Sequence, residues 1–148
     1  MKKTLLFPFF TAFLCLGMGN LYAQAKDPLN GSWITFDDET NQAAAVVLIS
    51  EKNGLFSGTV TKLLDPSALP SCEKCTDARK GKPVVGMEIL TGLSKTADSY
   101  TGGRILDPED GEIYRATIKL TEQGNKLDLR AYVGLPILGR TQTWIREK

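Results

Sequence analysis

Hydrophobic and polar residues alternate with a period of two through most of the chain beyond residue 30. The clearest stretch covers residues 114–120, where apolar and aromatic side chains hold the even positions and Arg, Thr and Lys hold the odd ones. A strand with this pattern buries one face and leaves the other in water. No long stretch shows the 3.6-residue period of an amphipathic helix. The pattern therefore predicts an all-β domain with little helix.

The alternating segments and the turns between them predict eight strands. These strands span residues 32–36, 44–50, 55–63, 85–91, 100–106, 112–121, 126–133 and 140–146. Several links are short and contain Gly or Asn, residues that accept the positive φ of tight hairpins, so neighbouring strands should pair antiparallel. Eight such strands can stack as two sheets or close into an up-and-down barrel, and closure removes the exposed edges. We expect the barrel, with an interior that is either filled or able to hold one small ligand.

Residues 1–25 have the features of a secretory signal. Lys2 and Lys3 precede an apolar stretch over residues 5–16, and small residues follow at Ala23 and Ala25. The apolar stretch is shorter than the roughly 20 residues that a membrane-spanning helix needs. We expect cleavage after Ala23 or Ala25, no transmembrane segment in the mature protein, and a periplasmic or secreted location.

The composition narrows the function of the remaining domain, residues 26–148. The 148-residue chain has 18 Lys and Arg against 17 Asp and Glu, so it lacks the basic field of a nucleic-acid-binding protein. It contains no histidine, which excludes Ser-His-Asp and Cys-His catalysis and every zinc site built on histidine. We expect neither a cofactor nor an enzymatic activity.

Cys72 and Cys75 lie in the longest link of the chain, which is rich in proline. In an exported protein this pair is expected to form a structural disulfide. A redox pair and a metal site shared between copies are the alternatives, but a redox motif of this spacing belongs at the start of a helix after a strand. Haem attachment needs a histidine where this chain has Thr76.

Four acidic residues crowd one predicted turn, at Asp107, Glu109, Asp110 and Glu112. Such carboxylates could bind Ca²⁺, yet the spacing of an EF-hand is absent. A glycosidase pair is disfavoured because carboxylates on one turn seldom face each other across a substrate. We interpret the segment as a tight turn, in which Pro108 sets φ and a glycine follows.

One face of the last predicted strand carries Arg140, Gln142, Trp144 and Arg146. Pointing inward, this row would give an apolar barrel a cationic, hydrogen-bonding lining suited to an amphiphile with an acidic head. Arg104 and Tyr114 on the neighbouring hairpin would support it. In the alternative interpretation, Arg140 and Gln142 satisfy backbone carbonyls at the barrel end and Arg146 is solvated. Trp144, like Trp33, is favoured as a core residue over a ligand contact.

Five segments together resemble an uncharacterised family of secreted bacterial proteins, domain-of-unknown-function family 2147. They are residues 31–33, 72–75, 86–90, 102–114 and 130–144. The resemblance implies a lipocalin-like, calycin-type barrel that is exported, with no established activity. Gly31-x-Trp33 also resembles the start of lipocalin barrels, where the Trp plugs the base under a cation from the last strand. Arg140 or Arg146 could supply that cation.

The sequence therefore favours an exported protein of the bacterial envelope that binds a small apolar or amphiphilic molecule. The alternative is a protein interaction module with a filled barrel. Its contacts would come from residues 64–83 and from residues 134–139, which contain Leu135, Ile137 and Leu138. An exposed apolar patch on the second of these segments would favour the alternative.

Overall fold

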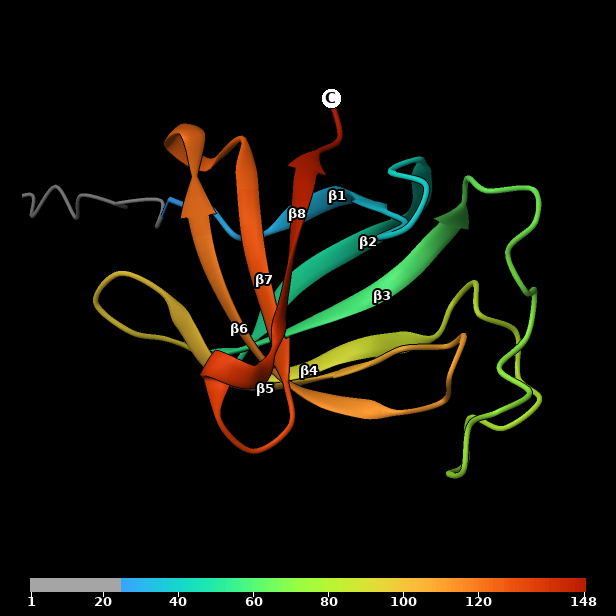
Figure 1. The fold of residues 1–148 in the computed structure, drawn as a ribbon. Coiled ribbons are helices and arrows are strands. Elements are labelled where there is room, and N and C mark those ends of the chain that lie inside the picture. The colour runs from blue at the N-terminus through green and yellow to red at the C-terminus, as the bar shows by residue number, and fades with distance from the viewer. Residues whose placement is uncertain (1–24) are drawn as a thin grey trace, which may run out of the picture.

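The computed structural model describes residues 25–148, so the predicted secretory signal, apart from Ala25, and the predicted cleavage after Ala23 lie outside the described residues. Eight strands form one closed antiparallel barrel in chain order, with β1 paired to β8 (Figure 1). They are β1 Gly31–Phe36, β2 Ala43–Lys52, β3 Leu55–Leu63, β4 Glu88–Lys95, β5 Tyr100–Leu106, β6 Ile113–Thr121, β7 Lys126–Tyr132 and β8 Arg140–Arg146. Two short 3₁₀ turns, η1 Glu122–Gly124 and η2 Pro136–Leu138, precede β7 and β8. The predicted eight-stranded up-and-down barrel is confirmed.

The start of β4 differs from the prediction, which placed it at Val85. Gly86 has a φ of +89° and turns the chain before the strand begins. Its amide donates to the carbonyl of Val60 at 2.7 Å, and the Val60 amide donates to the carbonyl of Met87 at 3.0 Å. These bonds hold the segment against β3 as a turn. The strand therefore begins at Glu88 and extends to Lys95.

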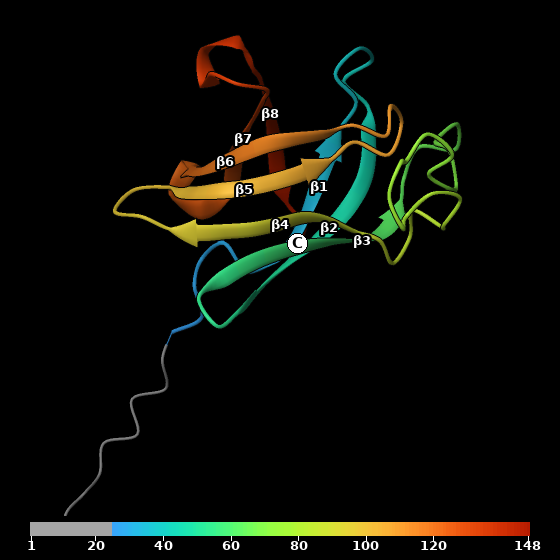
Figure 2. The ribbon, with the colours of Figure 1, turned by 90° about the horizontal axis from the view of Figure 1, so that it is seen from below.

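Alternate links lie at opposite ends of the barrel, as up-and-down connectivity requires. The β1–β2, β3–β4, β5–β6 and β7–β8 links share one end, which we call the mouth, and the other links share the base. Figure 2 shows the long β3–β4 link, residues 64–87, on the same side as the β1–β2 and β5–β6 turns. No helix within residues 25–148 is long and apolar enough to span a membrane.

Trp33 closes the base of the barrel. Its side chain is fully buried, and its indole N–H donates to the carbonyl of Leu29 at 3.0 Å. The guanidinium carbon of Arg146 lies 4.2 Å from the centroid of the ring, within cation–π range. The same guanidinium donates to three backbone carbonyls, those of Pro28, Asn30 and Gly124. Arg146 is thus the cation over Trp33, and the interpretation of Arg146 as a solvated side chain was wrong.

Asp27 fastens the segment before β1 across the base. Its carboxylate accepts a hydrogen bond from the Tyr100 hydroxyl at 2.6 Å and pairs with the Lys95 ammonium at 2.6 Å. Burial opposes ionisation of this carboxyl, but the bonds from Lys95, Tyr100 and the Leu29 amide outweigh burial and hold its pKa below the usual value. The charge of Asp27 therefore helps to seal this end.

The half of the barrel next to the base is packed with side chains. Large apolar residues from most of the strands meet there with almost no solvent exposure, among them Ile49, Phe56, Leu90, Leu93, Ile118 and Leu127. Phe56 meets Tyr100 edge to face, with ring centroids 5.1 Å apart. Burial of these apolar side chains stabilises the barrel at its base.

Cys72 and Cys75 form a disulfide inside the 64–87 link. Both residues are buried, and the sulfur of Cys72 lies 3.5 Å from the carbonyl oxygen of Pro108 in the β5–β6 turn. The disulfide thus shapes a loop that packs against a neighbouring turn at the mouth. This arrangement is the predicted structural disulfide.

Replacing both cysteines by serine should lower the free energy of unfolding by about 2 kcal/mol, because the closed four-residue loop restricts the unfolded chain. The measurement is denaturant unfolding of the wild type and of the double variant Cys72→Ser/Cys75→Ser. The reduced wild type should match the variant. Unchanged midpoints in both would show that the disulfide adds nothing to stability.

Candidate functional site

The mouth half of the barrel holds a cavity of about 300 Å³. All eight strands contribute to its lining, together with three of the four mouth links. Its apolar wall includes Phe36, Ala44, Ala45, Val47, Val60, Leu63, Val84, Ile89, Ile105, Leu106, Leu129 and Ala131. The barrel is therefore packed at its base and hollow at its mouth.

Strand β8 runs from the mouth into the barrel and places alternate side chains in this cavity. Arg140 is exposed, Gln142 is half-buried and Trp144 is buried, so the row descends from solvent to core. The Trp144 indole N–H donates to the Gln142 side-chain oxygen at 3.2 Å, and the Gln142 amide donates to Asp38 at 3.0 Å. The period-two pattern put these side chains on one face and left its direction open, and the structure places Arg140, Gln142 and Trp144 against the cavity.

Arg140 is held between two carboxylates. Its guanidinium lies 3.0 Å from Asp38 in the β1–β2 turn and 3.0 Å from Asp107, where β5 ends. The same group lies 5.9 Å from the centre of the Tyr114 ring. Arg140 thus pairs with acidic side chains instead of the backbone carbonyls considered in the alternative interpretation, and its charge is already compensated.

Tyr114 also lines the cavity, from strand β6. Its hydroxyl donates a hydrogen bond to the carboxylate of Asp110 at 2.7 Å, and this bond, with partial burial, raises the pKa of Tyr114 to about 12. The phenol is therefore neutral at physiological pH. It contributes an aromatic face to the cavity, while its donor is used by the β5–β6 turn.

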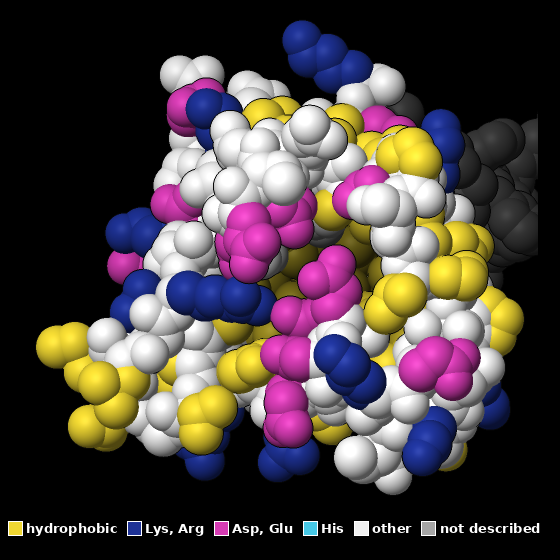
Figure 3. Space-filling model, turned by 45° about the vertical axis from the view of Figure 1, so that its right-hand side comes forward, with side chains coloured by type: hydrophobic (Ala, Val, Ile, Leu, Met, Phe, Trp, Pro, Cys, Tyr) yellow, Lys and Arg dark blue, Asp and Glu magenta, His cyan; other side chains and the backbone are white. Residues whose placement is uncertain are grey.

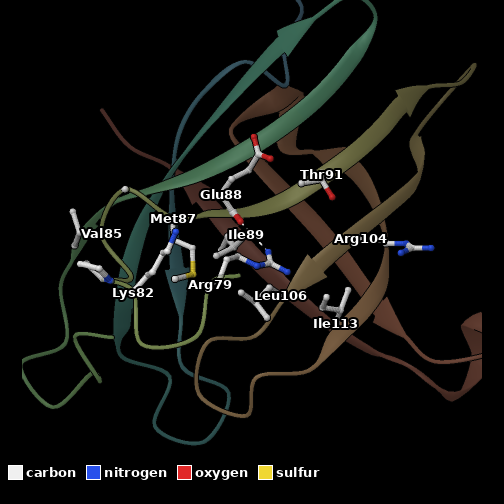
Figure 4. A pocket seen from close by; sticks show the side chains of 12 residues that line it. Arg79, Lys82, Val85, Met87, Glu88, Ile89, Thr91, Arg104, Leu106 and Ile113 are labelled. Atoms are coloured by element: carbon white, nitrogen blue, oxygen red, sulfur yellow. Dashed lines mark hydrogen bonds between the residues drawn. The ribbon is translucent and has the colours of Figure 1, made fainter. Parts of the chain in front are cut away.

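Arg104 does not line the cavity, contrary to the prediction. Its neighbours Gly103 and Ile105 are buried inside the barrel, so the pleat of β5 directs Arg104 outward. It lines a groove of about 660 Å³ on the outer wall. Figure 4 shows Arg104 at one end of this groove, with Lys82 and Val85 at the other end. Its direct partner on β6 is Arg115, another exposed cation. Arg104 thus belongs to the outer surface.

Acidic side chains form the rim of the cavity, a feature that the sequence did not predict as a group. Five carboxylates and one guanidinium are among the lining residues, and the carboxylates are those of Asp37, Asp38, Glu39, Asp107 and Glu109. Figure 3 shows acidic side chains around a hollow with a hydrophobic interior. We call these five residues the acidic rim.

The β5–β6 part of the rim is a tight turn, as predicted. The Gly111 amide donates to the carbonyl of Asp107 at 2.8 Å, and the Asp107 amide donates to the carbonyl of Glu112 at 2.9 Å. Asp107 and Asp110 also accept bonds from amides within the turn. Within residues 25–148, no group of three or more His, Cys, Asp or Glu side chains is arranged to hold a metal ion.

The β7–β8 link carries an exposed apolar segment at the mouth end. Leu135, Ile137 and Leu138 are 64–81% exposed. Arg130 holds the link in place by donating to the carbonyls of Pro136 and Ile137. The apolar patch considered for an interaction module is present, whereas the filled barrel of that hypothesis is not.

A closed eight-stranded barrel with a Trp-plugged base and an open apolar cavity defines a lipocalin-like protein. A solved structure, protein HP1028 from the human pathogen Helicobacter pylori, is described as belonging to the lipocalin family. It matches with a TM-score of 0.71 and 24% identity, over 81% of this chain and 83% of that chain. At this identity the likeness shows the fold.

The sequence profile of a bacterial family, described as "uncharacterized protein conserved in bacteria (DUF2147)", matches residues 31–146. The chain belongs to this family, as the resemblance implied. None of the curated proteins matches the sequence.

Proposed function

We propose that this protein binds a small apolar or amphiphilic molecule in the mouth half of its barrel. The observation that carries the proposal is the cavity of about 300 Å³, which has apolar walls, a Trp144 indole and polar groups at its rim. Ligand sites commonly combine an apolar hollow with a few polar groups that orient the ligand. The lipocalin description of the Helicobacter pylori protein supports the same function.

The chemistry of the cavity supports binding in preference to catalysis. The chain has no histidine, and Arg140, Gln142 and Tyr114 are engaged in ion pairs or hydrogen bonds with the turns. We propose that the protein acts in the periplasm or outside the cell, and the buried disulfide supports an oxidising compartment.

Ala131 offers a direct test, because this buried residue on β7 faces the cavity. Titration with the uncharged fluorescent probe N-phenyl-1-naphthylamine should saturate at one probe per protein. Leucine at this position fills part of the cavity, so Ala131→Leu should weaken probe binding about tenfold, in line with a loss near 1.4 kcal/mol. Ala97→Leu is the matched control, since Ala97 is exposed in the β4–β5 turn and should leave binding unchanged.

Equal binding by the wild type and both variants would place the probe outside the cavity. The exposed segment with Leu135, Ile137 and Leu138 would then be the binding surface, and the protein interaction module would replace the proposal. Absence of probe binding to the wild type would contradict the small-molecule function.

A further inference from the structure

The acidic rim is only partly neutralised by the protein itself. Arg140 pairs with Asp38 and Asp107, but it does not pair with the other three carboxylates of the rim. Asp37, Glu39 and Glu109 have no ion-pair partner within residues 25–148. The whole chain is nearly neutral, so this excess of negative charge is a local property of the mouth.

Glu109 lies where both burial and neighbouring carboxylates oppose its negative charge. Its side chain has no hydrogen-bond donor within residues 25–148. Burial, followed by the charges of Asp107, Asp37, Asp65 and Glu39, raises the pKa of this carboxyl above its usual value. These charges come from the β1–β2 turn, the β3–β4 link and the β5–β6 turn, so three mouth links act on the same space. A positive charge placed there would relieve the repulsion.

The apolar wall begins directly below these carboxylates. Phe36, Ala44 and Leu63 line the cavity that the rim surrounds. A molecule that uses both features needs an apolar body and a positive head. An anionic head would meet three carboxylates that lack an ion-pair partner and an arginine that already has two carboxylate partners, so it is disfavoured.

We infer that the ligand of this cavity is a cationic amphiphile, with its apolar body in the barrel and an ammonium-type head among Asp37, Glu39 and Glu109. This inference rests on the proposed small-molecule function and replaces the acidic head expected from the sequence. Coulomb attraction to three carboxylates selects the charge of the head, and the apolar wall selects the body.

Three probes with the same eight-carbon chain isolate the effect of the head: octylammonium, octanol and octanoate. Their affinities are measured by calorimetry at pH 7 and low ionic strength. Octylammonium should bind at least about tenfold tighter than octanoate, with octanol between them. At about 0.5 M salt the difference between the charged probes should shrink, because the rim is solvent-exposed.

Variants that remove carboxylate charges test whether the rim causes the preference for the cationic probe. The double variant Glu39→Gln/Glu109→Gln should weaken octylammonium binding about fivefold and leave octanol binding unchanged. Glu51→Gln is the matched control, because Glu51 is an exposed carboxylate of β2 near the base. It should change neither affinity. Thermal melting of each variant confirms that it is folded.

The outcomes separate the two proposals. If octanol binds and octylammonium binds no tighter than octanoate, the cationic ligand is excluded and the proposed function stands. If octylammonium binding survives Ala131→Leu, the ammonium binds the rim without using the cavity, and the inference fails. If none of the three probes binds, the proposed function fails and the inference fails with it.

Discussion

Replacing Trp33 by alanine should lower the free energy of unfolding by about 3–5 kcal/mol, the usual cost of removing a buried Trp. The side chain is fully buried at the base, and Arg146 covers its face. Its loss would leave a void, and it would leave the carbonyl of Leu29 without its indole donor. Because domains are typically stable by only about 5–15 kcal/mol, this variant should unfold at far lower denaturant concentration.

Denaturant unfolding followed by far-ultraviolet circular dichroism measures the effect without relying on Trp fluorescence. Trp33→Phe serves as the control, because it keeps an aromatic ring under Arg146 and removes only the indole N–H and part of the volume. Its loss should be clearly smaller than that of the alanine variant. Equal stability of Trp33→Ala and the wild type would show that the base is not closed by this residue.

Gly111→Ala should destabilise the protein by about 2–4 kcal/mol, through two effects that add. Gly111 has a φ of +76°, a conformation that costs other residues about 1–2 kcal/mol. A Cβ at this position would also overlap the carbonyl group of Lys74 and lie 2.8 Å from the Cys75 amide nitrogen. These atoms belong to the backbone of the disulfide loop, so the loop has to move away from the β5–β6 turn.

Gly54→Ala is the matched control for this substitution. Gly54 has a φ of +79°, but no atom lies within 4 Å of the position of its Cβ. Chemical denaturation should therefore show a loss of only about 1–2 kcal/mol, the backbone part alone. Hydrogen exchange should accelerate in residues 64–87 for Gly111→Ala and not for the control. Equal losses in the two variants would mean that the contact between loop and turn has no energetic role.

The sequence was sufficient for the architecture because each strand carries its own pattern. Alternation placed seven of the eight strands within two residues of their observed limits, and short turns implied antiparallel neighbours. Strand β4 was misplaced because Gly86 turns the chain through bonds to Val60, a partner that local pattern does not reveal. The same alternation put Arg140, Gln142 and Trp144 on one face of β8, but it left open whether that face points into the barrel.

The site was harder to predict because it depends on which turns meet when the barrel closes. Arg140 lies 33 residues from Asp107, and Gln142 lies 104 residues from Asp38, so their pairing follows from strand register around the whole barrel. Nothing in the sequence around the acidic dipeptide at residues 37–38 indicated that it lines the rim of the cavity. Arg104 was assigned to the site although alternation with Gly103 and Ile105 could have shown that it points outward.

Arg140 also connects two separate parts of the mouth through its ion pairs. Its guanidinium pairs with Asp38 in the β1–β2 turn and with Asp107 at the end of β5. Ion pairs as exposed as these contribute about 0–1 kcal/mol each, so either pair is easily broken. The two ion pairs can therefore break without disturbing the packed base, where Arg146 covers the buried Trp33.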